Sequence, residues 1–154
     1  MNYWLMKTEP NVFSYDDLCA AHGSTEPWDG VRNYQARNYM RDQFAVGDLV
    51  FIYHSSIKTP AIIGIAEVVR SAYPDVSALD PESKYYDIKS AQLGKSRWVA
   101  VDVKAKEKFQ KPLTVSQMRN IPGLANMKVL QKGQRLSIMP VTGEEWDLIL
   151  SFTR

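Results

Sequence analysis

Residues 97–109 have the sequence RWVAVDVKAKEKF, and their alternation decides which kind of fold the chain adopts. In an extended chain Trp98, Ala100 and Asp102 would lie on one side, and the valines between them would lie on the other. A repeat of two residues is the period of a β-strand. The stretch therefore predicts a long strand, with a sheet at the centre of the fold.

Apolar runs before and after this strand predict the other strands of the sheet. They are rich in aliphatic and aromatic residues and are bounded by turn signals such as Gly47-Asp48. We expect these strands at residues 3–8, 49–54, 61–70 and 135–139. The segments 24–32 and 71–96 contain prolines and glycines, so we expect turns in the first and a long irregular loop in the second. Loops of that length are often functional.

Short helices are predicted where capping residues precede suitable segments. Ser14 with Asp17, and Thr142 with Glu145, match the capping box, and Asn33 is a third favourable first residue. Helices are expected at residues 15–21, 34–43, 114–120, 126–131 and after 142. This mixed order, with few β-α-β units, predicts a single α+β domain over residues 1–154, built as a curled sheet or barrel with short helices beside it.

Composition narrows the class of protein. The 154 residues are 45% hydrophobic with a net charge of +2, which excludes a disordered chain. No apolar run is long enough to span a membrane, and no signal peptide is visible, so we expect no membrane partner. Cys19 is the single cysteine, and a reducing, cytoplasmic compartment is the expectation. Residues 89–135 carry a net charge of +9 and the rest of the chain −7, a division that suggests an anionic partner or a solvated surface.

Catalytic and cofactor motifs are absent from the sequence. It contains no GxSxG, HExxH, GxxxxGK[ST] or GxGxxG pattern, and only two histidines, so we expect no metal site and no cofactor. Cys19 and His22 lie three residues apart, but a lone cysteine in a helix is more often a small buried residue. His54-Ser55-Ser56 at a strand end has the residue types of a base and a nucleophile, although an ordinary polar loop explains it more simply.

The most informative segment is WDGVRNYQARN, residues 28–38. Gly30 permits a tight turn that would present Trp28 at the edge of a pocket. Amides and arginines follow it, and such side chains bind base edges and phosphates, while an indole face stacks on a base. An amphipathic helix that simply packs Tyr34 and Ala36 is the competing interpretation.

These residues resemble the EVE domain family. The likeness rests on residues 3–10 (YWLMKTEP), the WDGVRNYQARN segment and Tyr53-His54-Ser55, and it extends over about residues 2–152. The shorter motifs Tyr73-Pro74-Asp75, Tyr85-Tyr86-Asp87 and Arg135-Leu136-Ser137 agree with it. The resemblance implies a PUA-like fold, a curled β-barrel with flanking short helices. The EVE family is similar to YTH domains, which hold a methylated base in an aromatic-lined pocket.

The resemblance implies a non-catalytic reader of a modified nucleobase, with modified cytosine in DNA ahead of a base in RNA. The base would be flipped out of its stack. Trp28 would stack on it, Tyr53 would be the opposite wall, and Asp29, Asn33 and Ser55 would bond its polar edge. The other residues expected in the base pocket are Lys7, Thr8, Val31 and His54, and those expected on phosphates are Arg32, Arg37, Lys95, Arg97 and Arg135.

Two other function classes remain open from the sequence. One is an enzyme that acts on a modified base or nucleoside, with Glu9, Asp29 or His54 as acid or base. The other is a protein-interaction module, which would bind no oligonucleotide. The sequence leaves open which modification is bound and the oligomeric state, for which a monomer is the default.

Overall fold

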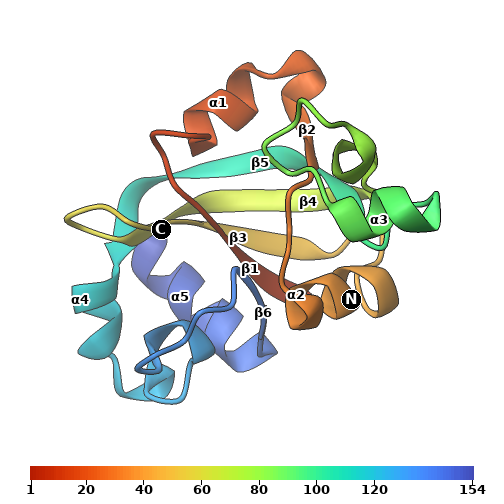
Figure 1. Cartoon of the computed structure of the whole chain (residues 1–154). Coiled ribbons are helices and arrows are strands. Elements are labelled where there is room, and N and C mark those ends of the chain that lie inside the picture. Colours follow the sequence, from red (N-terminus) through yellow and green to blue (C-terminus); the bar gives the residue numbers. More distant parts are fainter.

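The computed structural model describes all residues, 1–154, and its centre is a six-stranded mixed sheet (Figure 1). The strand order is β2-β5-β4-β3-β1-β6, and only the pairing of β1 with β3 is parallel. The strands are β1 (Tyr3–Thr8), β2 (Thr25–Trp28), β3 (Leu49–His54), β4 (Ala61–Pro74), β5 (Val99–Thr114) and β6 (Ile138–Val141). The expected α+β class is therefore confirmed.

Short helices cover both faces of the sheet (Figure 1). The α-helices are α1 (Tyr15–Ala20), α2 (Tyr34–Asp42), α3 (Ile88–Leu93), α4 (Val115–Arg119) and α5 (Gly143–Thr153). Single 3₁₀ turns are η1 (His22–Ser24), η2 (Val76–Leu79), η3 (Pro122–Leu124) and η4 (Lys128–Leu130). The first turn of α2 is capped as expected, because Asn33 Oδ1 accepts a hydrogen bond from the Ala36 amide at 3.0 Å.

Alternation along the strands divides the core into two apolar clusters. In β1, Leu5 belongs to the cluster under α4 and α5, whereas Trp4 and Met6 belong to the cluster under α1 and α2. Trp146 of α5 stacks on Phe51 of β3 with ring centroids 3.8 Å apart. Each fully buried large side chain of this kind stabilises the fold by about 1.5–3 kcal/mol. The sheet is thus fixed from both faces.

Two segments expected to be irregular contain regular structure. Residues 24–32 include the short strand β2, and residues 71–96 include the end of β4, η2 and α3. The strand β4 stays paired with β5 up to Pro74, although the register shifts between Val68 and Tyr73. The periodicity of two residues is broken by such shifts, so the sequence pattern ends before the strand does. We call residues 75–98, which leave β4 and return to β5, the excursion.

The sheet is open, so the expectation of a barrel is wrong in that respect. The edge strand β2 pairs only with β5, and the other edge strand, β6, pairs only with β1. Each edge strand is four residues long and contains a proline, Pro27 or Pro140. Proline has no N–H to donate, so these edges are poorly suited to close the sheet by pairing with each other. No helix has the length and apolar character needed to cross a lipid bilayer.

Candidate functional site

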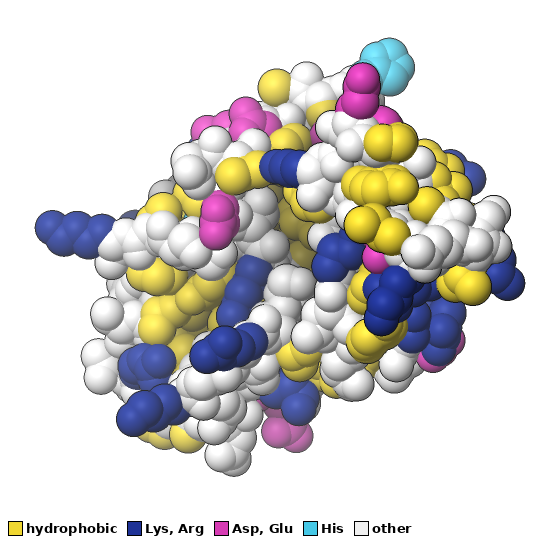
Figure 2. All heavy atoms as spheres, in the orientation of Figure 1, with side chains coloured by type: hydrophobic (Ala, Val, Ile, Leu, Met, Phe, Trp, Pro, Cys, Tyr) yellow, Lys and Arg dark blue, Asp and Glu magenta, His cyan; other side chains and the backbone are white.

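A cavity of about 630 Å³ lies between the end of β1 and the turn that follows β2. Figure 2 shows a hollow in this face of the molecule, with Lys and Arg side chains on both sides of it. Its size is within the range of small-molecule sites. The lining residues are Lys7, Thr8, Glu9, Val12, Phe13, residues 26–33, Lys84, Tyr85 and Ser137.

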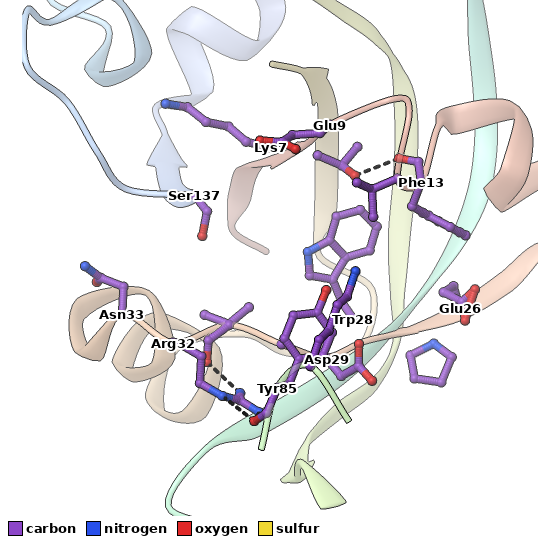
Figure 3. Close-up of a pocket in the computed structure, with 16 residues that line it drawn as sticks. Lys7, Glu9, Phe13, Glu26, Trp28, Asp29, Arg32, Asn33, Tyr85 and Ser137 are labelled. Carbon is purple, nitrogen blue, oxygen red and sulfur yellow. Dashed lines mark hydrogen bonds between the residues drawn. The ribbon is translucent and has the colours of Figure 1, made fainter. Parts of the chain in front are cut away.

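Trp28, the last residue of β2, presents its half-buried indole ring to the cavity (Figure 3). The ring of Phe13 contacts it edge-on, with centroids 6.0 Å apart and planes at 83°. Phe13 is held in turn by β1, because Thr8 Oγ1 donates a hydrogen bond to its carbonyl at 2.6 Å. The indole is therefore fixed in place before any ligand arrives, which lowers the entropy cost of stacking on it.

Tyr85 lines the cavity together with Phe13 and Trp28, and its position requires a glycine at residue 30 (Figure 3). The backbone of Gly30 has φ +76°, and a Cβ there would lie only 2.4 Å from the Tyr85 ring. Arg32 fixes Tyr85 from the other side, since Nε and Nη2 donate to the Tyr85 carbonyl at 3.2 and 2.8 Å. The turn after β2 and the excursion thus build one wall together.

A buried carboxylate, Asp75, joins these two segments. It accepts hydrogen bonds from the Gly30 amide at 2.9 Å, from Arg32 Nη1 at 2.9 Å and from the Ser77 amide at 3.0 Å. Burial alone would raise the pKa of Asp75, but the bonds from Ser77, Gly30 and Arg32 outweigh it and the pKa lies below its ordinary value. We call Asp75, Arg32, Gly30 and Ser77 the Asp75 cluster.

A second carboxylate, Asp87, does not line the cavity and fixes the part of the excursion that returns to β5. It accepts hydrogen bonds from Arg97 Nε at 2.7 Å, from Trp98 Nε1 at 2.9 Å and from Ser90 Oγ at 2.6 Å. Hydrogen bonds from Arg97 and Ser90 hold the pKa of Asp87 well below its ordinary range. The indole of Trp98 also stacks on Tyr34 of α2 with centroids 5.0 Å apart. We call Asp87, Arg97, Trp98 and Ser90 the Asp87 cluster.

Charged side chains of both signs line the cavity. Lys7 and Lys84 have no acidic group within ion-pair distance, and burial lowers the pKa of Lys7. Burial, with Asp75 nearby, raises the pKa of Asp29, and burial with Asp29 and Asp102 nearby raises that of Glu26. The cavity therefore offers free ammonium groups and carboxylate acceptors to a polar ligand.

The structure brings together most of the residues expected in the base pocket. The cavity is lined by Lys7, Thr8, Trp28, Asp29, Val31 and Asn33. Tyr53, His54 and Ser55 do not line it. Tyr53 is 6% exposed and packs in the core cluster under α5, while His54 Nε2 accepts a hydrogen bond from the Tyr15 amide at 3.0 Å. Tyr85, not Tyr53, supplies the second aromatic wall.

The residues expected to bind phosphates differ in how many of their donor groups already have partners within the protein. All donors of Arg32 are directed at Val31, Asp75, Ser77 and Tyr85, so this side chain builds the cavity wall. Arg97 is bound to Asp87 and Tyr34, and Arg37 donates to Asn38 and to the Arg97 carbonyl. Lys95 and Arg135 are exposed and have no ion pair.

Some of the basic residues in the second half of the chain are paired with acidic residues. On β5, Lys106 pairs with Glu67 at 2.8 Å, and Lys108 pairs with Asp16 at 2.7 Å. These lysines are therefore partly neutralised by acidic residues from the first half of the chain.

Tyr85, Lys84 and Ser137 line the cavity, although the sequence pattern does not predict them there. Tyr85 and Ser137 occur in two of the short motifs that carry the family resemblance, and that was the available signal. Lys84 stands directly before one of these motifs, and its Nζ lies 5.1 Å from the centroid of the Tyr85 ring. Which strand end faces which loop depends on the sheet order, which no local pattern encodes.

Comparisons with known proteins agree with this architecture. The EVE domain model matches residues 2–152. Thymocyte nuclear protein 1 of Mus musculus is 37% identical over 166 residues, which covers 97% of this chain and 73% of that protein. A crystal structure of a Pseudomonas putida protein is 47% identical, covers 99% of each chain and has a TM-score of 0.92. A crystal structure of human THYN1 in complex with 5-methylcytosine-containing DNA is 36% identical, covers 100% of this chain and 98% of that chain, and has a TM-score of 0.89. With a family match over nearly its whole length and relatives of this similarity, the chain belongs to the EVE domain family.

Proposed function

We propose that this chain binds DNA that contains a modified cytosine and accepts the flipped base in the cavity between Trp28 and Tyr85. The observation that supports it most is the cavity itself, with two fixed aromatic rings and polar side chains around it. A similar chain, human THYN1, has been crystallised with 5-methylcytosine-containing DNA. Flipping a base costs unstacking energy, and a pocket of this kind offsets that cost.

Trp28 is proposed to stack on the base. The edge-on contact with Phe13 holds the indole ring in position. Stacking on an aromatic side chain contributes about 1–3 kcal/mol of binding free energy per base. Tyr85 is proposed to limit the base from the excursion side, since its ring is pressed against Gly30 and its carbonyl is bound by Arg32. The two walls belong to different segments, so the width of the cavity depends on the Asp75 cluster.

Asp29 is proposed to accept a hydrogen bond from the exocyclic amine of cytosine. Carboxylates accept from this amine, which thymine lacks. Asn33 Oδ1 is occupied by the helix cap, so its amide group is the part that remains to bond a base. Lys7, Thr8 and Ser137 complete the polar lining. This arrangement favours a modified cytosine over thymine, although both 5-methylcytosine and thymine have a methyl group at C5.

Phosphate contacts are proposed for three cations without ion pairs. Lys84 lies on its rim, and Lys95 and Arg135 are exposed without ion pairs. Arg37 and Arg97 can add to this set only if they exchange some of their present partners. Because phosphate contacts release counterions, binding is expected to weaken as salt increases.

Residues 1–154 are proposed to act as one domain, since both core clusters share the same sheet, and a monomer is the default proposal. Cys19 is a free thiol on the surface, as a reducing compartment allows, and the cytoplasm is the proposed location.

The experiment is a binding series with matched oligonucleotides. DNA and RNA strands with cytosine, 5-methylcytosine or 5-hydroxymethylcytosine at one position are titrated at two salt concentrations. Wild-type protein is expected to prefer a modified DNA strand. Trp28→Ala should weaken that binding about 5- to 150-fold, the equivalent of one lost stack, while Trp28→Phe keeps part of it.

A matched pair controls the experiment. Tyr85→Ala is expected to reduce the preference for the modified base, whereas Tyr86→Ala, at the exposed neighbouring position outside the cavity, should leave it unchanged. Equal binding to all strands by folded wild-type protein would contradict the proposal. A preference that appears only with RNA strands would support the proposed base pocket but show that the bound nucleic acid is RNA.

A further inference from the structure

One apolar side chain at the mouth of the cavity has no role in the proposed function. The apolar residues that line the cavity are Val12, Phe13, Pro27, Trp28, Val31 and Tyr85. Only Val12 and Pro27 among them are exposed, Val12 at 53%, and Pro27 is held within the pairing of β2 with β5. Exposed apolar side chains cost little singly, but a position on the rim of a base pocket is informative. Proteins that distort DNA frequently insert such side chains between base steps.

Val12 is also held in a rigid turn. The amides of Val12 and Phe13 both donate to the Glu9 carbonyl at 2.9 Å, and Thr8 Oγ1 closes the turn by donating to the Phe13 carbonyl. Since Phe13 contacts Trp28 directly, the tip of the turn is fixed relative to the proposed stacking ring. Valine is branched at Cβ and stiff about χ1, so little side-chain entropy is lost if it becomes enclosed.

We propose that Val12 enters the DNA base stack at the place that the flipped base vacates. This inference rests on the proposed function, because a wedge is needed only if a base leaves the stack. Once the base is in the cavity, the neighbouring base pairs have an exposed apolar gap, and an apolar group at the cavity mouth covers it. Val12 would fill the gap in the duplex while Trp28 stacks on the base that has left it. Phe13 follows Val12 in the chain and contacts the Trp28 ring, so it links the two positions.

The other exposed residues that line the cavity are Glu9, Pro27, Asp29, Asn33 and Lys84. Pro27 is held in the pairing of β2 with β5, and the others are polar or charged, so their chemistry fits the stack less well. Lys84 illustrates this. Placing an ammonium group between base pairs removes it from water without a partner, which is costly. The same group is well suited to a phosphate at the edge of the cavity. Val12 is therefore the side chain that the chemistry assigns to the stack.

The test compares a duplex with a single strand. A single strand carrying 5-methylcytosine delivers its base to the cavity without leaving a gap in a duplex, so it does not need the wedge. Val12→Ala is expected to weaken binding to the 5-methylcytosine duplex about tenfold, as expected for two lost methyl groups, and to leave single-strand binding within about twofold. Val12→Met should restore duplex binding, and Val12→Ser should behave like Val12→Ala.

Val46→Ala is the matched control, because Val46 is 62% exposed and lies outside the cavity. It should change neither affinity. Equal losses on duplex and single strand for Val12→Ala would overturn the wedge and make Val12 a simple lining contact. Duplex binding that does not change on substitution, or wild-type protein that binds the single strand but no duplex, would also overturn it. If wild-type protein shows no preference for any modified strand, the proposed function itself fails, and that outcome is distinct from a failure of the wedge alone.

Discussion

Two carboxylate clusters hold the same excursion, but only one of them touches the cavity. The Asp75 side chain is 1% exposed and its arginine partner 25%, while the Asp87 side chain is 14% exposed and its partner 24%. Asp75 bonds Gly30 and Arg32, which both line the cavity, whereas the partners of Asp87 do not. The two clusters are in contact, since the Arg32 guanidinium lies 5.4 Å from the centroid of the Trp98 ring and the Asp75 amide donates to the Trp98 carbonyl at 2.9 Å. Only the Asp75 cluster, however, has members that line the cavity, so it is expected to affect the shape of the cavity more.

The largest effect is expected from Asp75→Asn. It leaves Arg32 partly buried without its counter-ion, and breaking a buried pair in this way costs about 3–5 kcal/mol of unfolding free energy. Urea denaturation measures this change, and affinity for the modified strand should fall with it. Asp87→Asn is the matched change in the other cluster, and it should lower the affinity of the folded protein less, because no partner of Asp87 lines the cavity. Equal losses of affinity in both variants would contradict the claim that the Asp75 cluster affects the shape of the cavity more than the Asp87 cluster does.

Gly30→Ala is expected to have the next largest effect. A Cβ at this position would lie 2.4 Å from the Tyr85 ring, so the ring must move, at a cost of about 1–3 kcal/mol. Gly94→Ala provides the control, because Gly94 has a similar φ of +74° but no atom within 4 Å of the added Cβ. Thermal unfolding of both variants isolates the contact with Tyr85 from backbone strain. If only Gly30→Ala weakens binding, the contact with Tyr85, and not backbone strain alone, is what affects the cavity.

Acid should destabilise the protein through both clusters. The pKa values of Asp75 and Asp87 are lower in the folded chain than the ordinary carboxyl value of 3.8, so the unfolded chain binds protons first as the pH falls. Stability from these groups is complete at neutral pH and is lost as the pH falls through and below the ordinary carboxyl range. Denaturation curves between neutral pH and about pH 3 should show this loss. Asp87→Asn should make the loss shallower, and an unchanged slope would contradict the assignment.

The smallest effect is expected at an exposed ion pair. Lys106 and Glu67 are 2.8 Å apart on the surface of the sheet, with side chains 54% and 32% exposed. Such pairs contribute about 0–1 kcal/mol, so Lys106→Ala should change the unfolding free energy by less than about 1 kcal/mol. Denaturation at low and high salt checks this. A loss of unfolding free energy as large as that of Asp75→Asn would mean that burial does not determine how much an ion pair contributes to stability.

The elements with strong local signals were predictable from sequence. Alternating or continuous apolar runs gave β1, β3 and the greater part of β4 and β5, and caps such as Ser14 and Asn33 gave α1 and α2. The strand β2 was missed because it has four residues and contains Pro27. The excursion was taken for a loop because its helices are short and the end of β4 is irregular.

The site was predictable only where one segment forms it. Residues 28–33 lie at the cavity because they form a single turn, and the WDGVRN motif marked them. The second wall required knowing that the excursion folds back on this turn, which depends on the sheet order and on Asp75. Tyr53 stands at a strand end, as predicted, but its side chain belongs to the core face. Alternation along a strand does not say which face a ligand will approach.

The prolines on the two edge strands have a consequence for association between molecules. An open sheet exposes rows of unpaired backbone groups that can join the sheet of another molecule and begin aggregation. Pro27 and Pro140 interrupt both rows in this chain, and each edge strand is only four residues long. The sheet can therefore stay open beside the cavity, where a barrel would be closed, without offering a template for amyloid-like stacking.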